Sequence, residues 1–434
     1  MSQQPATEYD VIGVGFGPSN LALAIALDEC ARRARLKCHA LFVEKRPHFI
    51  WHGGMLLPDA DMQISFLKDL VSLRDPTSPF TFVNYLHKRG RLEGFINCRT
   101  FYPSRLEFND YLRWVAGQFK DLAAYGETIV AIEPVTAGQF VTSLRVRSRT
   151  PGGGETVRLA RNLVVAAGGA PHIPAIFGKL ADDPRLTHSS SYLDTVDTIS
   201  ADHKAINIAV VGGGQSAAEV TVDLRGRFPN ANVDLIFRGH ALKPSDSSPF
   251  VNEIFNPEYT DFIFSQPGEH REAIVRNFRN TNYAVVDSDL LDQLYRLLYQ
   301  QRVSGKEHIA LHPRSEVTGV VPTPNGIELE TVDKFDGGSR RRAYDAVILA
   351  TGYDRDRPLS VLEPIRTYIQ GSEPDRNYRL ATSPTFRPHV YLQGYSEASH
   401  GLSDTLLSVL AIRSQEIAES LLLTISRREL IAYA

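Results

Sequence analysis

The feature that most constrains the fold is the glycine-rich turn within residues 10–20, which read Asp-Val-Ile-Gly-Val-Gly-Phe-Gly-Pro-Ser-Asn. An apolar run enters this turn, and the apolar residues 21–27 follow it. A strand, a turn that lets the backbone approach a phosphate, and a helix whose free N–H groups face that phosphate together bind a dinucleotide pyrophosphate. The sequence therefore predicts a βαβ unit and a dinucleotide site with the contacts Gly13, Gly15, Gly17, Pro18 and Ser19.

Two residues refine the prediction for this first site. Pro18 replaces the third glycine of the G-x-G-x-x-G pattern, and proline is acceptable in the first turn of a helix because its missing N–H would be unpaired there. Glu44 follows the apolar residues 40–43 at the expected end of the second strand. A carboxylate there accepts hydrogen bonds from both ribose hydroxyls, which suits an adenosine without a 2′-phosphate. A glycine-rich turn without a ligand is the alternative, and the combination of strand, turn, helix and acid disfavours it.

A second strand, turn and helix begin with the apolar residues 206–211 and continue through Gly-Gly-Gly-Gln-Ser-Ala at 212–217. This is the G-x-G-x-x-A variant of the same pattern. The next apolar run, 233–237, ends in Arg238 instead of an acid, and a cation there suits the 2′-phosphate of NADP. A surface arginine at a strand end remains the alternative for Arg238. The contacts expected at this second site are Gly212, Gly214, Gln215, Ser216 and Arg238.

Composition narrows the class of protein. A chain of 434 residues is too long for one ordinary core, so two domains are expected. The net charge of −3 and the lack of a dense Lys/Arg run argue against nucleic acid or an anionic membrane as partner. No segment resembles a signal peptide or a membrane span, so a cytoplasmic location is expected. The cysteines Cys30, Cys38 and Cys98 form no C-x-x-C pair, which argues against a metal site and a redox-active disulfide.

The order of these segments predicts an α/β protein with two Rossmann-like domains, the second inserted into the first. The first domain is expected to take residues 1–180 and to resume at 343–434. The inserted domain is expected at 181–342. Within it, the alternation of apolar and polar residues is lost at 239–280, and we expect this segment to form a small substrate lid.

The two sites together suggest a reaction. A first site without a 2′-phosphate preference and a second with one point to FAD and NADPH, so hydride would pass from the nicotinamide to the flavin. Because no redox cysteine pair or metal cluster is expected, molecular oxygen is the plausible acceptor. A flavin hydroperoxide would then insert one oxygen atom into a nucleophilic substrate.

At this point the chain resembles a known family, the N-hydroxylating flavin monooxygenases of siderophore biosynthesis, and within it the L-ornithine N-monooxygenases. The ending Pro18-x-Asn20, unusual for a generic fingerprint, is the form that this family uses. The resemblance implies FAD- and NADPH-dependent hydroxylation of L-ornithine to N(5)-hydroxy-L-ornithine, an early step towards a hydroxamate siderophore. It rests on the motifs at 13–20, 51–52, 62–70, 212–217, 248–253, 280–283, 350–353 and 400–408.

The resemblance also implies roles for single residues. Gln63 would lie near the reactive edge of the flavin, and Lys68 would pair with the substrate α-carboxylate. Asn252 would bind the α-amino and carboxylate end of the substrate, and Ser408, on the C-terminal helix, would complete that pocket. Asn282 would contact the nicotinamide ribose, so that retained NADP shields the hydroperoxide. The other implied contacts are Trp51, His52, Met62 and Leu407 at the flavin, with Thr351, Gly352 and Tyr353 at NADPH and the domain boundary.

The residues by themselves leave simpler interpretations open. Lys68 and its neighbour Asp69 could form a solvated pair, and Asn252 could cap a turn. Ser408 could bond back to its own helix, and Gln63 could satisfy loop backbone. No general base is expected: the substrate amine, with an ordinary pKa of about 10.4, would be made nucleophilic by desolvation, so activity should rise with pH.

Alternatives for the function also remain at this stage. The same chemistry could act on L-lysine or on a diamine such as putrescine, because a pocket separates substrates that differ by one methylene only about 10–200-fold. The chain could instead be an NADPH-dependent flavin oxidase or reductase that releases peroxide, or a nucleotide-binding sensor. L-ornithine and molecular oxygen are the expected partners, and a homo-oligomer is left open.

Overall fold

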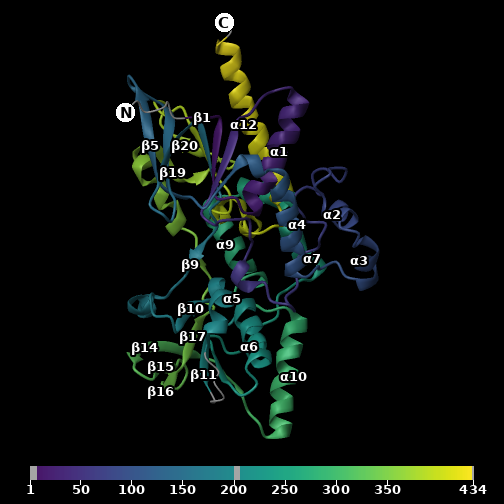
Figure 1. Ribbon diagram of the computed structural model, residues 1–434, viewed down its shortest axis with the longest axis vertical. Coiled ribbons are helices and arrows are strands. Elements are labelled where there is room, and N and C mark those ends of the chain that lie inside the picture. The colour runs from purple at the N-terminus through teal and green to yellow at the C-terminus, as the bar shows by residue number, and fades with distance from the viewer. Residues whose placement is uncertain (1–6, 200–205, 433–434) are drawn as a thin grey trace.

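The computed structural model describes residues 7–199 and 206–432, and two parallel sheets organise it (Figure 1). The first sheet belongs to what we call the first module, residues 7–171 and 353–432. The second sheet belongs to the second module, residues 172–352. The two modules lie one beyond the other along the long axis of the molecule. The predicted α/β architecture with two dinucleotide-binding folds, the second inserted into the first, is confirmed.

The first sheet is parallel and takes strands from both ends of the chain, in the order β21-β8-β2-β3-β4. Its strands are β21 (His389–Leu392), β8 (Asn162–Val165), β2 (Val11–Val14), β3 (Ala40–Glu44) and β4 (Ala123–Tyr125). β2 and β8 are buried along their whole length, as expected for a sheet covered on both faces. Residues of the C-terminal part therefore complete the sheet that carries the first glycine-rich turn.

Helices cover this sheet. α1 (Pro18–Ala34) packs beside α12 (Leu410–Ala432), so a helix from the N-terminal part of the chain lies against the C-terminal helix (Figure 1). Residues 21–27 of α1 are all buried, so the predicted apolar helix is confirmed. The other helices here are α2 (Phe82–Lys88), α3 (Leu92–Cys98) and α4 (Arg105–Gln118). In the described part of the chain, no helix combines the length and the apolar character needed to cross a bilayer.

The second sheet is also parallel, in the order β10-β17-β11-β12-β13. Its strands are β10 (Leu186–His188), β17 (Ala346–Leu349), β11 (Asn207–Val211), β12 (Asn232–Ile236) and β13 (Ile309–His312). Its helices are α5 (Tyr192–Thr195), α6 (Gln215–Arg227) and α10 (Ser288–Ser304). Because β17 pairs with β10 and β11, residues 346–349 lie in the second sheet and not, as their place after residue 342 suggested, in the first domain.

A mixed sheet, in which β1 and β7 are parallel and the other pairs antiparallel, and several antiparallel sheets complete the modules. A four-stranded sheet in the first module has the order β1-β7-β6-β5, and a three-stranded sheet in the second has the order β14-β15-β16. Short pairs join β9 to β18 and β19 to β20. The bounds are β1 (Glu8–Tyr9), β7 (Glu155–Ala160), β6 (Phe140–Arg149), β5 (Thr128–Ala137), β14 (Ser315–Thr323), β15 (Gly326–Asp333), β16 (Ser339–Tyr344), β9 (Ala170–Pro171), β18 (Tyr353–Asp354), β19 (Ile369–Pro374) and β20 (Leu380–Thr382).

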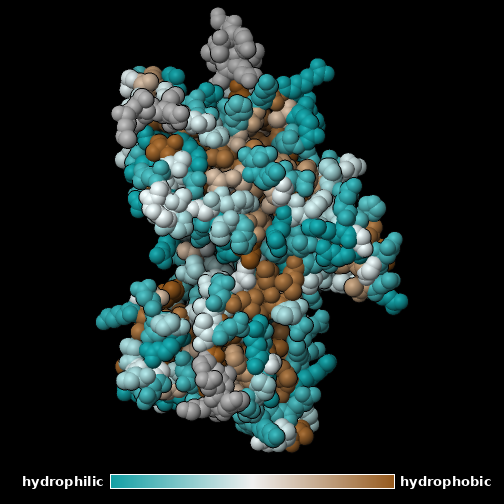
Figure 2. Space-filling model, viewed as in Figure 1, coloured by the Kyte–Doolittle hydropathy of each residue, from teal (hydrophilic) through white to brown (hydrophobic). Residues whose placement is uncertain are grey.

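The segment predicted as an irregular lid, 239–280, contains three helices. They are α7 (Pro249–Asn252), α8 (Pro257–Ser265) and α9 (Gly268–Phe278). α8 and α9 contact α11 (Glu397–His400) of the first module, and an ion pair of 2.6 Å joins Asp261 to Arg376. The segment therefore bridges the two modules. Figure 2 shows hydrophobic residues gathered between the modules on the face in view, whereas most of the outer surface is hydrophilic.

Candidate active site

The first glycine-rich turn has the geometry of a pyrophosphate seat. Gly15 has a φ of +83°, and a Cβ atom there would lie 2.8 Å from the carbonyl oxygen of Ala166. Gly17 is the N-cap of α1, and a Cβ atom there would meet nothing within 4 Å. The Asn20 amide holds the turn by donating to the Gly15 carbonyl at 2.7 Å. The turn is thus packed on its sheet side and open at the helix N-terminus, where phosphates bind.

Glu44 lies beside this turn, at the end of β3 as predicted. Its Oε2 accepts a hydrogen bond from the Phe16 N–H at 2.8 Å, and its Oε1 accepts one from the Arg46 N–H at 2.9 Å. A carboxylate offers about four acceptor positions, so two remain for ribose hydroxyls. The position and the remaining acceptor capacity of Glu44 fit an adenosine ribose.

Two buried polar atoms beyond the end of β21 support the same fit. Gln393 Oε1 and Ser396 Oγ have no hydrogen-bond partner among the described residues. The Gln393 amide nitrogen donates to Asn20 Oδ1 at 3.0 Å, which places this side chain against the first turn. Buried polar atoms in native proteins are nearly always paired, and ligands of parallel sheets bind at the carboxyl ends of the strands. These atoms fit a polar ligand such as FAD.

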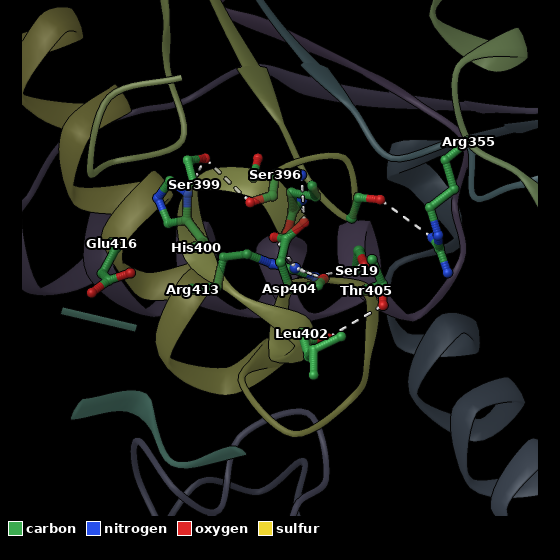
Figure 3. A network of polar contacts seen from close by, with 12 residues as sticks. Ser19, Arg355, Ser396, Ser399, His400, Leu402, Asp404, Thr405, Arg413 and Glu416 are labelled. Carbon is green, nitrogen blue, oxygen red and sulfur yellow. Dashed lines mark hydrogen bonds and ion pairs between the residues drawn. The ribbon is translucent and has the colours of Figure 1, made fainter. Parts of the chain in front are cut away.

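A buried ion pair fixes the loop before α12 to the first turn (Figure 3). Arg413 Nη1 lies 2.8 Å from Asp404 Oδ1, and both side chains are almost fully buried. Arg413 Nη2 donates to Ser19 Oγ at 3.1 Å, and Asp404 Oδ2 accepts from the Ser396 N–H at 2.7 Å. The sequence analysis missed this pair. The signal was an arginine inside the apolar run that begins at residue 409, where a charge needs a buried partner.

The second glycine-rich turn resembles the first. Gly212 has a φ of +150°, and a Cβ atom there would lie 2.3 Å from the carbonyl oxygen of Ala350. Gly214 is the N-cap of α6, so Gln215 and Ser216 occupy its first turn as predicted. Arg238 follows β12 by two residues and is exposed. An exposed cation at this strand end is accessible to a 2′-phosphate.

Asn282 lies where the modules meet. Its segment runs against the second turn, because the Cα atom of Ala284 would be 3.5 Å from a Cβ atom at Gly214. The hydroxyl of the adjacent Tyr283 donates to Glu397 of the first module at 2.5 Å. Asn282 thus stands between the second dinucleotide turn and the first module, which is where a nicotinamide ribose would lie if hydride passes between the two sites.

Met62 and Gln63 differ in their surroundings. Met62 is buried, and its N–H donates to the Pro103 carbonyl at 2.9 Å. Gln63 is exposed, and its amide nitrogen donates to Asp287 Oδ1 in the second module at 3.0 Å. The hydrogen bond of the Gln63 side chain therefore goes to a side chain across the junction of the modules and not to loop backbone.

Lys68 and Asp69 do not form a solvated pair. Asp69 is buried, and its carboxylate accepts hydrogen bonds from the N–H groups of Val71, Ser72 and Phe82. Lys68 is half-buried, and burial alone lowers the pKa of its amine, with no described carboxylate acting on it. A partly desolvated cation without a carboxylate partner suits the binding of an anionic ligand group.

Asn252 and Ser408 are the other predicted substrate contacts. The Asn252 amide donates to the Ser247 carbonyl at 2.9 Å, so it fastens the turn before α7 and keeps its oxygen free of this bond. Ser408 is buried. It was predicted to lie on the C-terminal helix, but it precedes that helix, because α12 begins at Leu410. The chain is extended at Leu406, so the preceding short helix has already ended. Leu407 packs against the apolar core of the first module.

An aromatic cluster marks the boundary of the modules. The ring centroid of His52 lies 4.7 Å from that of Trp51 and 6.1 Å from that of Tyr353. Gly352 has a φ of +81°, and its carbonyl oxygen lies 3.0 Å from His188 Nε2, while the Thr351 hydroxyl donates to the His172 carbonyl. These predicted residues therefore meet where β18 returns the chain to the first module.

Protein surroundings keep His52 neutral. Desolvation, followed by the cations Arg105, Arg46 and Arg355, lowers the pKa of His52 to about 4. An imidazole that is neutral near pH 7 has no second proton to give as a general acid.

Comparison with known proteins identifies the family. The model of the L-lysine 6-monooxygenase/L-ornithine 5-monooxygenase family matches residues 7–355. An L-ornithine N(5)-monooxygenase of Pseudomonas aeruginosa is 50% identical over 424 residues, which cover 97% of this chain and 96% of that protein.

Solved structures agree with this result. An ornithine hydroxylase from Pseudomonas aeruginosa superposes with a TM-score of 0.92 at 50% identity, over 96% of this chain and all of that one. An ornithine N-hydroxylase from Kutzneria sp. 744, solved with reduced FAD, NADP+ and L-ornithine, has a TM-score of 0.90 at 37% identity, over 97% of this chain and all of that one. The chain belongs to the L-lysine 6-monooxygenase/L-ornithine 5-monooxygenase family.

Proposed function

We propose that this protein hydroxylates the side-chain nitrogen of L-ornithine with FAD, NADPH and molecular oxygen, giving N(5)-hydroxy-L-ornithine for a hydroxamate siderophore. The observation that carries the proposal is the junction of the two modules. Each glycine-rich turn leads into the N-terminus of a helix, and Gln63 of the first module donates a hydrogen bond to Asp287 of the second. The curated relative and the two solved relatives all act on ornithine by name.

The residues of the chain divide the work. The first turn and Glu44 would hold FAD, which supplies the electrons that activate dioxygen. The second turn and Arg238 would hold NADPH, and Asn282 would orient its ribose. Lys68 and Asn252 would bind the carboxylate and amine of the amino acid, so that the side-chain amine extends away from that charged end.

The chain itself must make the substrate amine nucleophilic. Its ordinary pKa of about 10.4 leaves little of the neutral form at pH 7, so the bound amine would have to be desolvated. This account needs no general base.

The test is a hydroxylamine assay on purified, FAD-loaded protein with NADPH and oxygen. L-ornithine, L-lysine and putrescine are compared while NADPH oxidation is followed. We expect hydroxylamine from ornithine in amounts that match the NADPH consumed. Hydroxylamine from lysine alone would show that lysine and not ornithine is the substrate. A preference for putrescine would contradict the proposed contact with the substrate carboxylate. Peroxide without hydroxylamine would show that the protein is a flavin oxidase.

A further inference from the structure

An ion pair joins the modules close to the second turn. Arg105 begins α4 in the first module, and Glu219 lies on α6 in the second (Figure 1). Arg105 Nη1 donates to Glu219 Oε2 at 3.0 Å, and Nη2 donates to Oε1 at 2.7 Å. The two side chains are only 12% and 5% exposed. Such a two-point contact fixes direction as well as distance between the elements that carry it.

The same carboxylate begins a chain of hydrogen bonds that returns to the first module. Glu219 Oε1 also accepts from the Gln215 amide at 2.9 Å, and Gln215 Oε1 accepts from the Asp287 N–H at 2.8 Å. Asp287 Oδ1 in turn accepts from the Gln63 amide at 3.0 Å. The nitrogen and the oxygen of the Gln215 amide therefore each have a partner, and Glu219 and Asp287 together fix its orientation.

Stability alone does not account for this arrangement. Removing two charges from water costs so much that apolar residues of similar volume are often as stabilising as a buried ion pair. Three donors from Arg105 and Gln215 meet one carboxylate, and only an ionised carboxyl group accepts all three. A glutamine at 219 would place its own NH2 group against one of these donors.

We propose that Arg105 and Glu219 are positioning residues that hold the second dinucleotide turn in register with Gln63, through Gln215 and Asp287. The inference rests on the proposed function, because it concerns the position of the proposed NADPH turn relative to the Gln63 amide, which is proposed to lie at the flavin. None of the roles proposed above for Gln63 and Gln215 requires them to be linked, so the linkage is an additional property of this chain.

The test compares Glu219→Gln with Glu127→Gln. Glu127 forms a similar two-point contact with Arg158 at 2.7 and 2.9 Å, both side chains are 14% exposed, and both lie within the first module. NADP+ affinity of the oxidised, FAD-loaded protein is measured by calorimetry without turnover. We expect Glu219→Gln to weaken NADP+ binding about tenfold, the size of a lost hydrogen bond to a charged group, and Glu127→Gln to leave it unchanged. Equal affinities in the two variants would overturn the inference.

A second pair of variants tests the link to Gln63. Asp287→Asn keeps an oxygen that accepts from the Gln63 amide, whereas Asp287→Ala removes it. We expect Asp287→Ala and Glu219→Gln both to lower the yield of hydroxylamine per NADPH, with Asp287→Asn close to the parent protein. Equal yields for Asp287→Ala and Asp287→Asn would show that the hydrogen bond from Gln63 to Asp287 plays no part, and would overturn the link to Gln63. Loss of NADP+ affinity in Glu219→Gln, in a protein that hydroxylates no amine, would refute the proposed function and leave the positioning role standing.

Discussion

At the scale of residues, the proposed contact for the substrate carboxylate is a cation that the fold leaves partly desolvated. Lys68 is half-buried, and its neighbour Asp69 is turned inwards to three backbone N–H groups. The carboxylate nearest in sequence therefore does not neutralise the lysine. This arrangement keeps the Lys68 charge for a ligand, at the cost of a lowered pKa.

Replacing Lys68 should affect the amino acid and not the reductant. Lys68→Ala removes a charge-assisted contact, so we expect the apparent KM for ornithine to rise about 10–100-fold while NADPH oxidation persists. Steady-state kinetics with ornithine as the varied substrate measure this. Lys88→Ala, at the exposed end of α2, is the control. Unchanged ornithine saturation in Lys68→Ala would remove Lys68 from the site.

Arg238 should distinguish the two nicotinamide cofactors. Its exposed guanidinium follows β12, where a 2′-phosphate would lie. Arg238→Ala should raise the KM for NADPH about 10–100-fold and leave the KM for NADH nearly unchanged, because NADH lacks that phosphate. The ratio of the two constants in one preparation is its own control. A parallel loss for both cofactors would contradict the phosphate role.

At the scale of elements, Arg413 connects α12 to the first turn. Among the described side chains of α12, it is the one deeply buried cation. The pair with Asp404 fixes the loop that ends in Ser408, and the contact with Ser19 reaches the start of α1. Arg413 therefore links the helix, the loop and the glycine-rich turn by direct contacts.

Breaking this pair should destabilise the protein strongly. Arg413→Met leaves the Asp404 charge buried without its partner, and we expect a loss of about 3–5 kcal/mol in the free energy of unfolding. Urea denaturation measures the loss. The double variant Arg413→Met/Asp404→Asn should recover part of it, because no charge is then left buried. A loss of less than about 1 kcal/mol in the single variant would show that Asp404 finds another partner or water.

The features of the site that could be predicted are those whose signal lies within a short stretch of sequence. The two turns and Glu44 were placed correctly because their signals lie within a strand, a turn and a helix that follow one another in the sequence. The pairing of β17 in the second sheet was missed because strand order in a parallel sheet is set by partners far apart in the chain.

Other features depend on contacts that a single sequence does not display. The three helices of segment 239–280 have only 4, 9 and 11 residues, so their apolar faces were too brief to give a clear periodic signal. The pair of Arg105 and Glu219 joins residues 114 positions apart. Whether Asn252 and Ser408 bind substrate stays a prediction.

At the scale of the whole molecule, His400 lies where the lid segment packs on the first module. Its ring centroid is 4.2 Å from that of Tyr378 and 5.1 Å from that of Phe264 in α8. Burial is the main reason that the pKa of His400 falls to about 4, while Asp404 acts in the opposite direction. The neutral imidazole is thus a condition for this packing.

The stability of the protein should therefore fall in mild acid. The pKa of His400 lies below the ordinary value of about 6.5, so on acidification the unfolded chain binds its proton first. Its contribution is complete above pH 6.5 and is lost as the pH falls towards 4, by at most about 1.4 kcal/mol per pH unit. Urea denaturation of the parent protein and of His400→Gln between pH 7.5 and 4.5 measures the difference. Parallel curves for the two proteins would exclude this contribution.

The pair of strands β9 and β18 marks where the second module is inserted into the first. Residues 170–171 leave the first module beside residues 353–354, which return to it, and the two pairs are hydrogen-bonded neighbours. An insertion whose entry and exit are adjacent can be exchanged as a cassette, because only two short junctions need to be matched. Chimaeras joined at this pair of strands would take the second dinucleotide turn and Asn252 from one parent, and Lys68 and Ser408 from the other.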